Sequence, residues 1–175
     1  MDTTEQEGSK VLNKNTSLLN LQKGQGLADE QQYLTFLMQG EEYGVDILSV
    51  QEIRGWGHVS PIPNAPVYVR GVINLRGAIV PVIDLRMLFE LPHHPYNENT
   101  VVIILKVTTD RVSRTMGIVV DAMSDVCTLA ATDKQPPPNV SQGVSYKFIE
   151  GLTEVKGKMV VLLSSELLLS LANNR

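Results

Sequence analysis

Short apolar runs separated by turn residues dominate the chain from Tyr33 onward. The runs are rich in Val, Ile and Leu and are shorter than most helices, which is typical of strands. The pattern predicts ten strands, at 33–39, 43–46, 52–54, 68–75, 78–83, 100–107, 115–120, 123–129, 148–155 and 158–163. Helical patterns are confined to a turn at 47–51 and to segments 85–91 and 165–172. The predicted fold class is therefore all-β.

The N-terminal segment 1–31 differs from the rest in being polar and rich in Gln, Asn, Thr and Lys. Such a composition buries too little apolar surface to offset the entropy of ordering the chain, so we expect a flexible tail. The folded domain is predicted to cover 32–171, with a short helix at 165–172 closing it.

The two halves of this domain resemble each other. Segment 70–89 aligns with 150–169 without a gap, and the turns Arg76-Gly77 and Lys156-Gly157 coincide. Four identities in twenty residues can arise by chance, but the shared order of strand, basic-Gly turn, strand and helix favours duplication. We therefore expect two similar small β-barrels side by side, at about 32–98 and 99–163. Neither half is long enough to bury much alone, so they should share an apolar core.

Composition excludes several classes of function. The 175 residues are 43% hydrophobic, 5% aromatic and 19% charged, with a formal net charge of −4. An acidic chain is a poor nonspecific ligand for nucleic acid, because phosphates are neutralised by Lys and Arg. The longest apolar runs, such as 78–83 and 101–105, are far shorter than the roughly 20 residues of a membrane-spanning helix. The N-terminus has no apolar run typical of a secretory signal, so a cytoplasmic location is expected.

Catalytic and cofactor-binding motifs are absent from the sequence. It contains no phosphate-binding loop, no dinucleotide fingerprint and no nucleophile elbow. Cys127 is the only cysteine and lies in a predicted strand, which favours a buried apolar role. His93 and His94 lie between two prolines and are expected to be solvated. Asp121 and Asp125 form solvated strand ends or, in the enzymatic alternative of a small β-barrel hydrolase, an acid–base pair. No cofactor and no metal site are predicted.

Two segments carry residues without an evident structural task. Arg76 lies at the tip of a predicted hairpin, flanked by apolar strands. In segment 45–54 the apolar residues are too frequent for a single buried face, so we expect some of Ile47, Val50 and Ile53 to be exposed. Such exposure predicts a docking surface.

Three motifs resemble the signatures of the CheW family of chemotaxis coupling proteins. They are 42–53 (EYGVDILSVQEI), 70–86 (RGVINLRGAIVPVIDLR) and 117–121 (GIVVD) followed by Ser124-Asp125-Val126. The resemblance extends from about Gln32 to Leu171, with the motifs in order and at the expected spacing.

The resemblance implies two SH3-like β-barrel subdomains of about five strands each, intertwined, and no enzymatic activity. It implies an adaptor that couples the cytoplasmic tips of chemoreceptors to the regulatory domain of the histidine kinase CheA. Other CheW copies are further expected partners in receptor arrays at the inner face of the membrane. Neither nucleic-acid binding nor direct membrane insertion is implied. A coupling module for a kinase pathway outside chemotaxis is the alternative within the same class.

The resemblance also assigns residues by position. Those expected to contact the receptor are Val50, Glu52, Asn74, Leu75, Arg76, Gly77 and Val101. Those expected to contact the kinase are Gln135 and Val140, in the loop 132–140. Family members carry a basic and an aromatic residue at these two loop positions, and this chain departs from that pattern.

Overall fold

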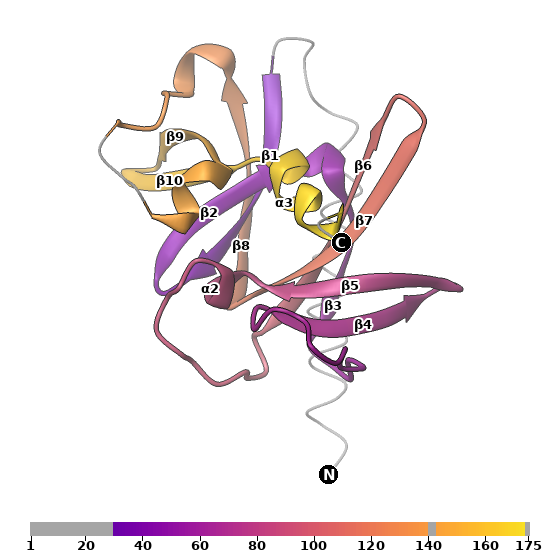
Figure 1. Cartoon of the computed structure of the whole chain (residues 1–175). Helices are drawn as coiled ribbons and strands as arrows, with labels where there is room; N and C mark the ends of the chain where they lie inside the picture. The colour runs from indigo at the N-terminus through magenta and orange to yellow at the C-terminus, as the bar shows by residue number, and fades with distance from the viewer. Residues whose placement is uncertain (1–29, 140–142, 174–175) are drawn as a thin grey trace, which may run out of the picture.

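Ten strands and a few short helical turns make up the described part of the chain. The computed structural model describes residues 30–139 and 143–173 (Figure 1). The strands are β1 (Glu30–Met38), β2 (Glu41–Asp46), β3 (Val50–Gly55), β4 (Val69–Leu75), β5 (Ala78–Asp84), β6 (Val101–Thr109), β7 (Val112–Val120), β8 (Ala122–Ala130), β9 (Ile149–Val155) and β10 (Lys158–Leu163). The α-helices are α2 (Leu85–Leu88) and α3 (Ser165–Ser170), and the 3₁₀ turns are η1 (Ile47–Ser49), η2 (Ala131–Asp133), η3 (Val144–Phe148) and η4 (Leu171–Asn173). The all-β prediction is confirmed.

The first strand begins earlier than its apolar pattern indicates. β1 starts at Glu30, inside the segment 1–31 that was expected to be a tail, and residues 1–29 lie outside the described part of the chain. Glu30 and Gln31 are strand because they continue the antiparallel pairing with Ala130 and Leu129 of β8. Polar residues can extend a strand when a partner strand supplies the hydrogen bonds.

The strands form two five-stranded sheets. Sheet A has the order β8-β1-β2-β10-β9, and sheet B has the order β3-β6-β7-β5-β4. Neighbouring strands pair antiparallel, except β2 with β10 and β5 with β7, which pair parallel. Strands β3, β4 and β5 of the first half correspond to β8, β9 and β10 of the second half, and β1 and β2 correspond to β6 and β7. With this correspondence the two sheets have the same strand order. Each sheet therefore contains strands from both halves of the sequence, and the two halves are intertwined.

Equal register confirms the internal duplication. Gly71 pairs with Val82 in sheet B, and Gly151 pairs with Leu162 in sheet A, 80 positions later. The isolated bridges Ser60–Val72 and Gln135–Leu152 are equivalent as well. Ser60 and Gln135 are 75 positions apart in the sequence, whereas Val72 and Leu152 are 80 positions apart. The second half thus has five extra residues, and they fall in the connection after Gln135.

The sheets are not closed barrels. In sheet A the outer strands are β8 and β9, and in sheet B they are β3 and β4, and neither pair is hydrogen-bonded as a ladder. In sheet B the segment after β3 comes between the two outer strands and forms the isolated bridge Ser60–Val72. In sheet A the segment after β8 does the same and forms the bridge Gln135–Leu152. We call the space between the outer strands of each sheet its edge gap. The SH3-like barrels expected from the resemblance are therefore curled open sheets.

A shared apolar core joins the two sheets, as the length of each half predicted. The largest buried cluster contains Phe36 and Leu163 from sheet A together with Ile103 and Ile118 from sheet B. Aliphatic side chains dominate it, and burying each contributes about 1.5–3 kcal/mol. α3 lies over the junction of the two sheets (Figure 1). No helix within residues 30–139 and 143–173 is long and apolar enough to cross a membrane.

Candidate functional site

The β4–β5 hairpin presents Arg76 to solvent. Arg76 and Gly77 have φ angles of 52° and 89°, the left-handed pair that a two-residue hairpin turn requires. The Asn74 side chain accepts a hydrogen bond from the Gly77 backbone N–H at 2.8 Å, which fixes the turn from within. The Arg76 side chain is 77% exposed. The hairpin projects from the body of the protein (Figure 1).

Glu52 on β3 forms an ion pair with Arg76 at the tip of this hairpin. Its Oε2 lies 3.2 Å from Nη2 of Arg76, although β3 and β4 are the opposite outer strands of sheet B. The curl of the sheet therefore brings its two edges together at this point. Arg54, two residues along β3, places its Nε 3.5 Å from Oε1 of the same carboxylate. Two arginines share one carboxylate, so the cluster carries one surplus positive charge.

The apolar residues assigned to the receptor are buried. Val50, Leu75 and Val101 are 1%, 8% and 7% exposed, respectively. Val50 and Val101 belong to the core between the sheets, and Leu75 belongs to a smaller core on the other face of sheet B. These three residues are thus core residues, whereas the exposed part of the predicted receptor surface consists of Asn74, Arg76, Gly77 and the edge of Glu52.

The expected docking surface in segment 45–54 is wrong for the residues named. Ile47, Val50 and Ile53 are all at most 4% exposed, and it is Leu48 that is 75% exposed. The physical reason is the crossover from β2 in sheet A to β3 in sheet B through η1. A segment passing between two sheets meets apolar side chains on more than one side, so it needs more than one apolar face.

A cavity of about 310 Å³ lies beside the charged cluster, in the edge gap of sheet B. Its lining comes from the end of β3, the following loop and β4, with Val102 of β6 behind: Arg54, Gly55, Gly57, His58, Val59, Ser60, Val72, Ile73, Asn74 and Val102. Neither this cavity nor Arg54 was predicted. The two glycines that flank Trp56 were the sequence signal, but they indicated only an irregular loop.

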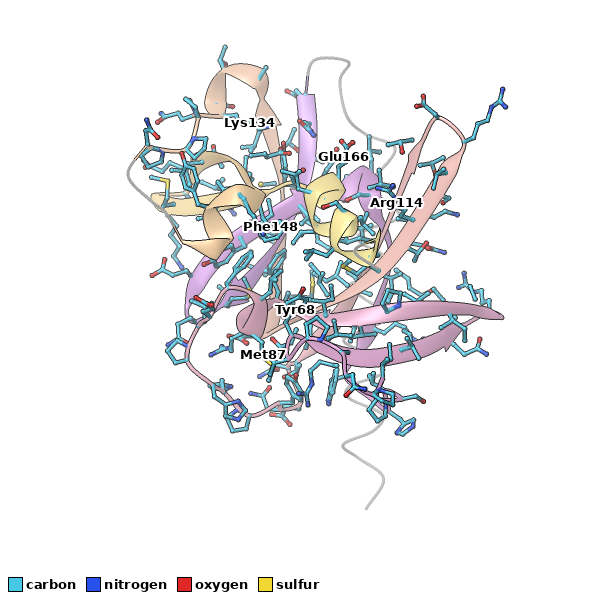
Figure 2. All side chains as sticks on the ribbon, viewed as in Figure 1. Tyr68, Met87, Arg114, Lys134, Phe148 and Glu166 are labelled. Atoms are coloured by element: carbon cyan, nitrogen blue, oxygen red, sulfur yellow. The ribbon has the colours of Figure 1, made fainter. Side chains whose placement is uncertain are left out.

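The loop assigned to the kinase lies on sheet A. Gln135 is exposed, and its backbone N–H and C=O both bond to Leu152 of β9 at 2.8 Å. Val140 lies outside the described residues. Lys134 anchors the loop, because its Nζ lies 2.7 Å from Oε1 of Glu150 and 3.0 Å from the hydroxyl of Tyr33. Figure 2 shows Lys134 at the end of the molecule opposite α2.

Tyr33 completes this anchor. Its hydroxyl donates to Oε1 of Glu150 at 2.8 Å. Burial, and to a lesser degree the Glu150 carboxylate, raises the pKa of Tyr33 to about 12 against the opposing effect of Lys134. The phenol therefore stays neutral at physiological pH and serves as a fixed donor.

The candidate acid–base pair is divided between structural contacts. Asp121 forms an ion pair with the buried Arg86 of α2, with Nε donating to Oδ1 at 3.1 Å. Asp125 accepts a hydrogen bond from the backbone N–H of Val126 at 2.8 Å. Each carboxylate is thus engaged in its own structural contact, and Asp121 connects α2 to the crossover between β7 and β8.

The remaining candidates do not form a catalytic group. His93 and His94 border a second cavity of about 320 Å³ beside α2, together with Arg70 and Tyr96. Cys127 is buried, and burial followed by the charges of Asp125 and Glu42 raises its pKa to about 11. Within the described residues, no three His, Cys, Asp or Glu side chains are grouped to hold a metal ion.

Comparison with known proteins identifies one family. The family model described as CheW-like domain matches residues 32–173. The chain is 45% identical to the chemotaxis protein CheW of Klebsiella aerogenes over 140 residues, covering 80% of this chain and 82% of that protein. It is 36% identical to the CheW of Rhizobium meliloti over 129 residues, covering 74% and 81%. Among solved structures, the scaffolding protein TtCheW from Thermoanaerobacter tengcongensis matches with a TM-score of 0.69 at 30% identity, covering 76% of this chain and 88% of that one.

Proposed function

The chain belongs to the CheW-like family, and on that premise we propose that it joins the cytoplasmic tips of chemoreceptors to the regulatory domain of a CheA-type histidine kinase. It is a non-enzymatic scaffold of chemotaxis signal transduction. We place it in the cytoplasm, recruited to receptor arrays at the inner face of the membrane.

The observation that supports the receptor surface is the charged cluster of Arg54, Glu52 and Arg76 on sheet B. Arg76 projects into solvent from the tip of the hairpin and pairs with Glu52 across the edge gap. Surface ion pairs of this kind contribute only about 0–1 kcal/mol to stability. Their arrangement instead favours recognition, because a partner helix with matching charge is held in one register.

The second surface is the loop that begins at η2 on sheet A. It is anchored by Lys134, Glu150 and Tyr33, and it presents Gln135. The receptor surface and this loop lie on different sheets, which a two-sided adaptor requires so that both partners bind together. The two sheets share a core, and each contains strands from both halves of the chain, so the two surfaces are joined by one continuous packed structure.

Amide-resolved NMR titrations of the labelled full chain test the proposal. One partner is a purified cytoplasmic tip fragment of a chemoreceptor, and the other is the CheA regulatory domain, each from the same organism. We expect the receptor fragment to shift signals around Glu52, Asn74 and Arg76, and the kinase domain to shift signals around Lys134 and Gln135. The absence of binding to both partners would contradict the proposed function.

A further inference from the structure

Because the two sheets are equivalent, the edge gap of sheet A can be compared directly with the edge gap of sheet B. In sheet A, η2 lies in the corresponding gap: the hydroxyl of Thr153 on β9 donates to the backbone carbonyl of Asp133 at 3.0 Å. The Asp133 carboxylate closes the turn by accepting from the backbone N–H of Ala130 at 3.0 Å. Thr153 is only 3% exposed as a result. A short turn of the chain itself thus covers this outer strand.

The corresponding segment of sheet B does not cover its outer strand. By the same offsets, Asp133 corresponds to His58 and Thr153 corresponds to Ile73. Residues 56–58 form no helical turn: Trp56 instead packs on Tyr96, with ring centroids 4.3 Å apart, and Gly57 has no side chain. Ile73 consequently lines the cavity of about 310 Å³ and stays partly exposed.

The difference is local, because the flanking contacts are the same in both gaps. A Cβ placed on Gly71 would meet Ser60 and Val59, and one placed on Gly151 would meet the equivalent Gln135 and Lys134. Both outer strands are thus approached by equivalent residues, more closely at Gly71, where the nearest atom would lie at 2.1 Å, than at Gly151, where it would lie at 2.9 Å. Sheet B differs in lacking a 3₁₀ turn equivalent to η2, which fills the edge gap of sheet A.

The lining of the cavity defines what it can hold. Val59 and Ile73, which pack against the cluster that contains Val102, form its apolar side, and Arg54, His58, Ser60 and Asn74 form its polar side. Arg54 shares the Glu52 carboxylate with Arg76, so no second carboxylate balances it in the cluster. The volume is at the small end of ligand sites, which begin at about 300 Å³, and suits one or two side chains rather than a whole strand.

We propose that this cavity is the anchor pocket of the receptor surface. It takes an aliphatic side chain of the receptor tip, and a carboxylate next to that side chain in the receptor pairs with Arg54. The proposal rests on the proposed function, and it is supported by the continuity of the cavity with the Arg76–Glu52 cluster and by its unbalanced positive charge.

A small-molecule titration tests the pocket without any receptor. The probe is 4-methylpentanoate, which joins a branched aliphatic group to a carboxylate, and its amide is the neutral control. We expect the acid to shift the methyl signals of Val59, Ile73 and Val102 at concentrations several-fold lower than the amide does, and Arg54→Gln to remove that difference. Equal binding of acid and amide would overturn the role of Arg54. Shifts absent with both would overturn the pocket.

A filled pocket tests the same proposal with the receptor fragment. Ile73→Phe enlarges the side chain that packs beside Val102 in the cavity, and Val112→Phe is the control at the exposed end of β7. We expect Ile73→Phe to lower receptor affinity about tenfold and Val112→Phe to leave it unchanged. Wild-type binding with an unaffected Ile73→Phe variant would overturn the pocket alone. A wild-type protein that fails to bind would instead refute the proposed function.

Discussion

Arg76 and Lys156 show how one local structure serves two purposes. Both occupy the first turn position of equivalent hairpins, with φ angles of 52° and 51°, and both precede a glycine. Arg76 reaches a carboxylate across the edge gap, whereas Lys156 takes part in none of the ion pairs found in the described residues. The basic-Gly turn is thus a structural feature in both halves, and only one half uses it for a charged surface.

Replacing Arg76→Glu should weaken receptor binding about tenfold or more, because two carboxylates would then face each other where a cation now meets the partner. The free energy of unfolding should change by less than about 1 kcal/mol, since the side chain is exposed. Isothermal titration with the receptor fragment and urea denaturation measure the two effects. Lys156→Glu is the control and should leave receptor affinity unchanged. Equal affinity of Arg76→Glu and wild type would remove Arg76 from the site.

Cys127 should be unreactive toward Ellman's reagent in the native protein at pH 8 and reactive in urea. The reagent needs a thiolate, and burial raises the pKa of this thiol to about 11 from 9.0. Because the folded pKa is the higher one, the neutral thiol stabilises the fold fully below pH 9. That contribution is lost as the pH rises toward 11. Rapid native labelling at pH 8 would show that the thiol is accessible.

At the level of the elements, the close approach of β4 to the loop after β3 depends on Gly71. This residue has a φ of +142°, and an added Cβ would lie 2.1 Å from the backbone oxygen of Ser60. Gly71→Ala should therefore lower the free energy of unfolding by about 2 kcal/mol or more. Gly57→Ala is the control, because a Cβ there meets no atom within 4 Å. Urea denaturation compares the two, and equal midpoints would contradict this packing.

The contact between α2 and the β7–β8 crossover depends on Arg86. Besides Asp121, its guanidinium donates to the side-chain oxygen of Gln39 at 2.7 Å and to the carbonyl of Pro92 at 3.0 Å. Arg86→Met should destabilise the fold by about 3–5 kcal/mol, because the partner carboxylate loses its counter-charge. Arg70→Met, which removes an exposed arginine, should cost less than about 1 kcal/mol. Thermal melts followed by circular dichroism distinguish the two variants.

For the whole molecule, strand exchange makes the two halves interdependent. Each sheet takes three strands from one half and two from the other. Fragments 1–98 and 99–175 should therefore each lack the dispersed amide spectrum of a folded protein, and mixing them should restore it. A parallel pair such as β5 with β7, which joins the halves, forms only when both fragments are present. A native-like spectrum from either fragment alone would show that a half can fold by itself.

Much of this fold was predictable because its determinants are local. Strand positions follow from β-branched runs, and the two equivalent hairpins follow from Arg76-Gly77 and Lys156-Gly157. Helix α2 begins where predicted because the Asp84 side chain accepts from the Met87 backbone N–H at 3.2 Å. Helix α2 ends at Leu88, before the predicted stop at 91, since the chain reverses at Glu90, whose φ is 56°.

The site was predictable only in part. Arg76 stands out as a basic residue at a hairpin tip, and family resemblance added Glu52. The pairing of these two side chains across the edges of a sheet depends on its curl, which no local pattern encodes. Arg54 could not be predicted, because the alternation of apolar and polar residues along β3 does not show that Arg76 approaches Glu52 from another strand.

The sequence by itself determined the strands, the turns, the duplication and the family, because these depend on side chains that are near one another along the chain. The family resemblance implied intertwined subdomains, but only the tertiary structure decided which strands the halves exchange and that Val50 and Val101 are buried. The tertiary structure also decided that one edge gap is filled by η2 while the other remains a cavity. Those outcomes depend on contacts between residues far apart in sequence, whose geometry is fixed only when both sheets pack on the shared core.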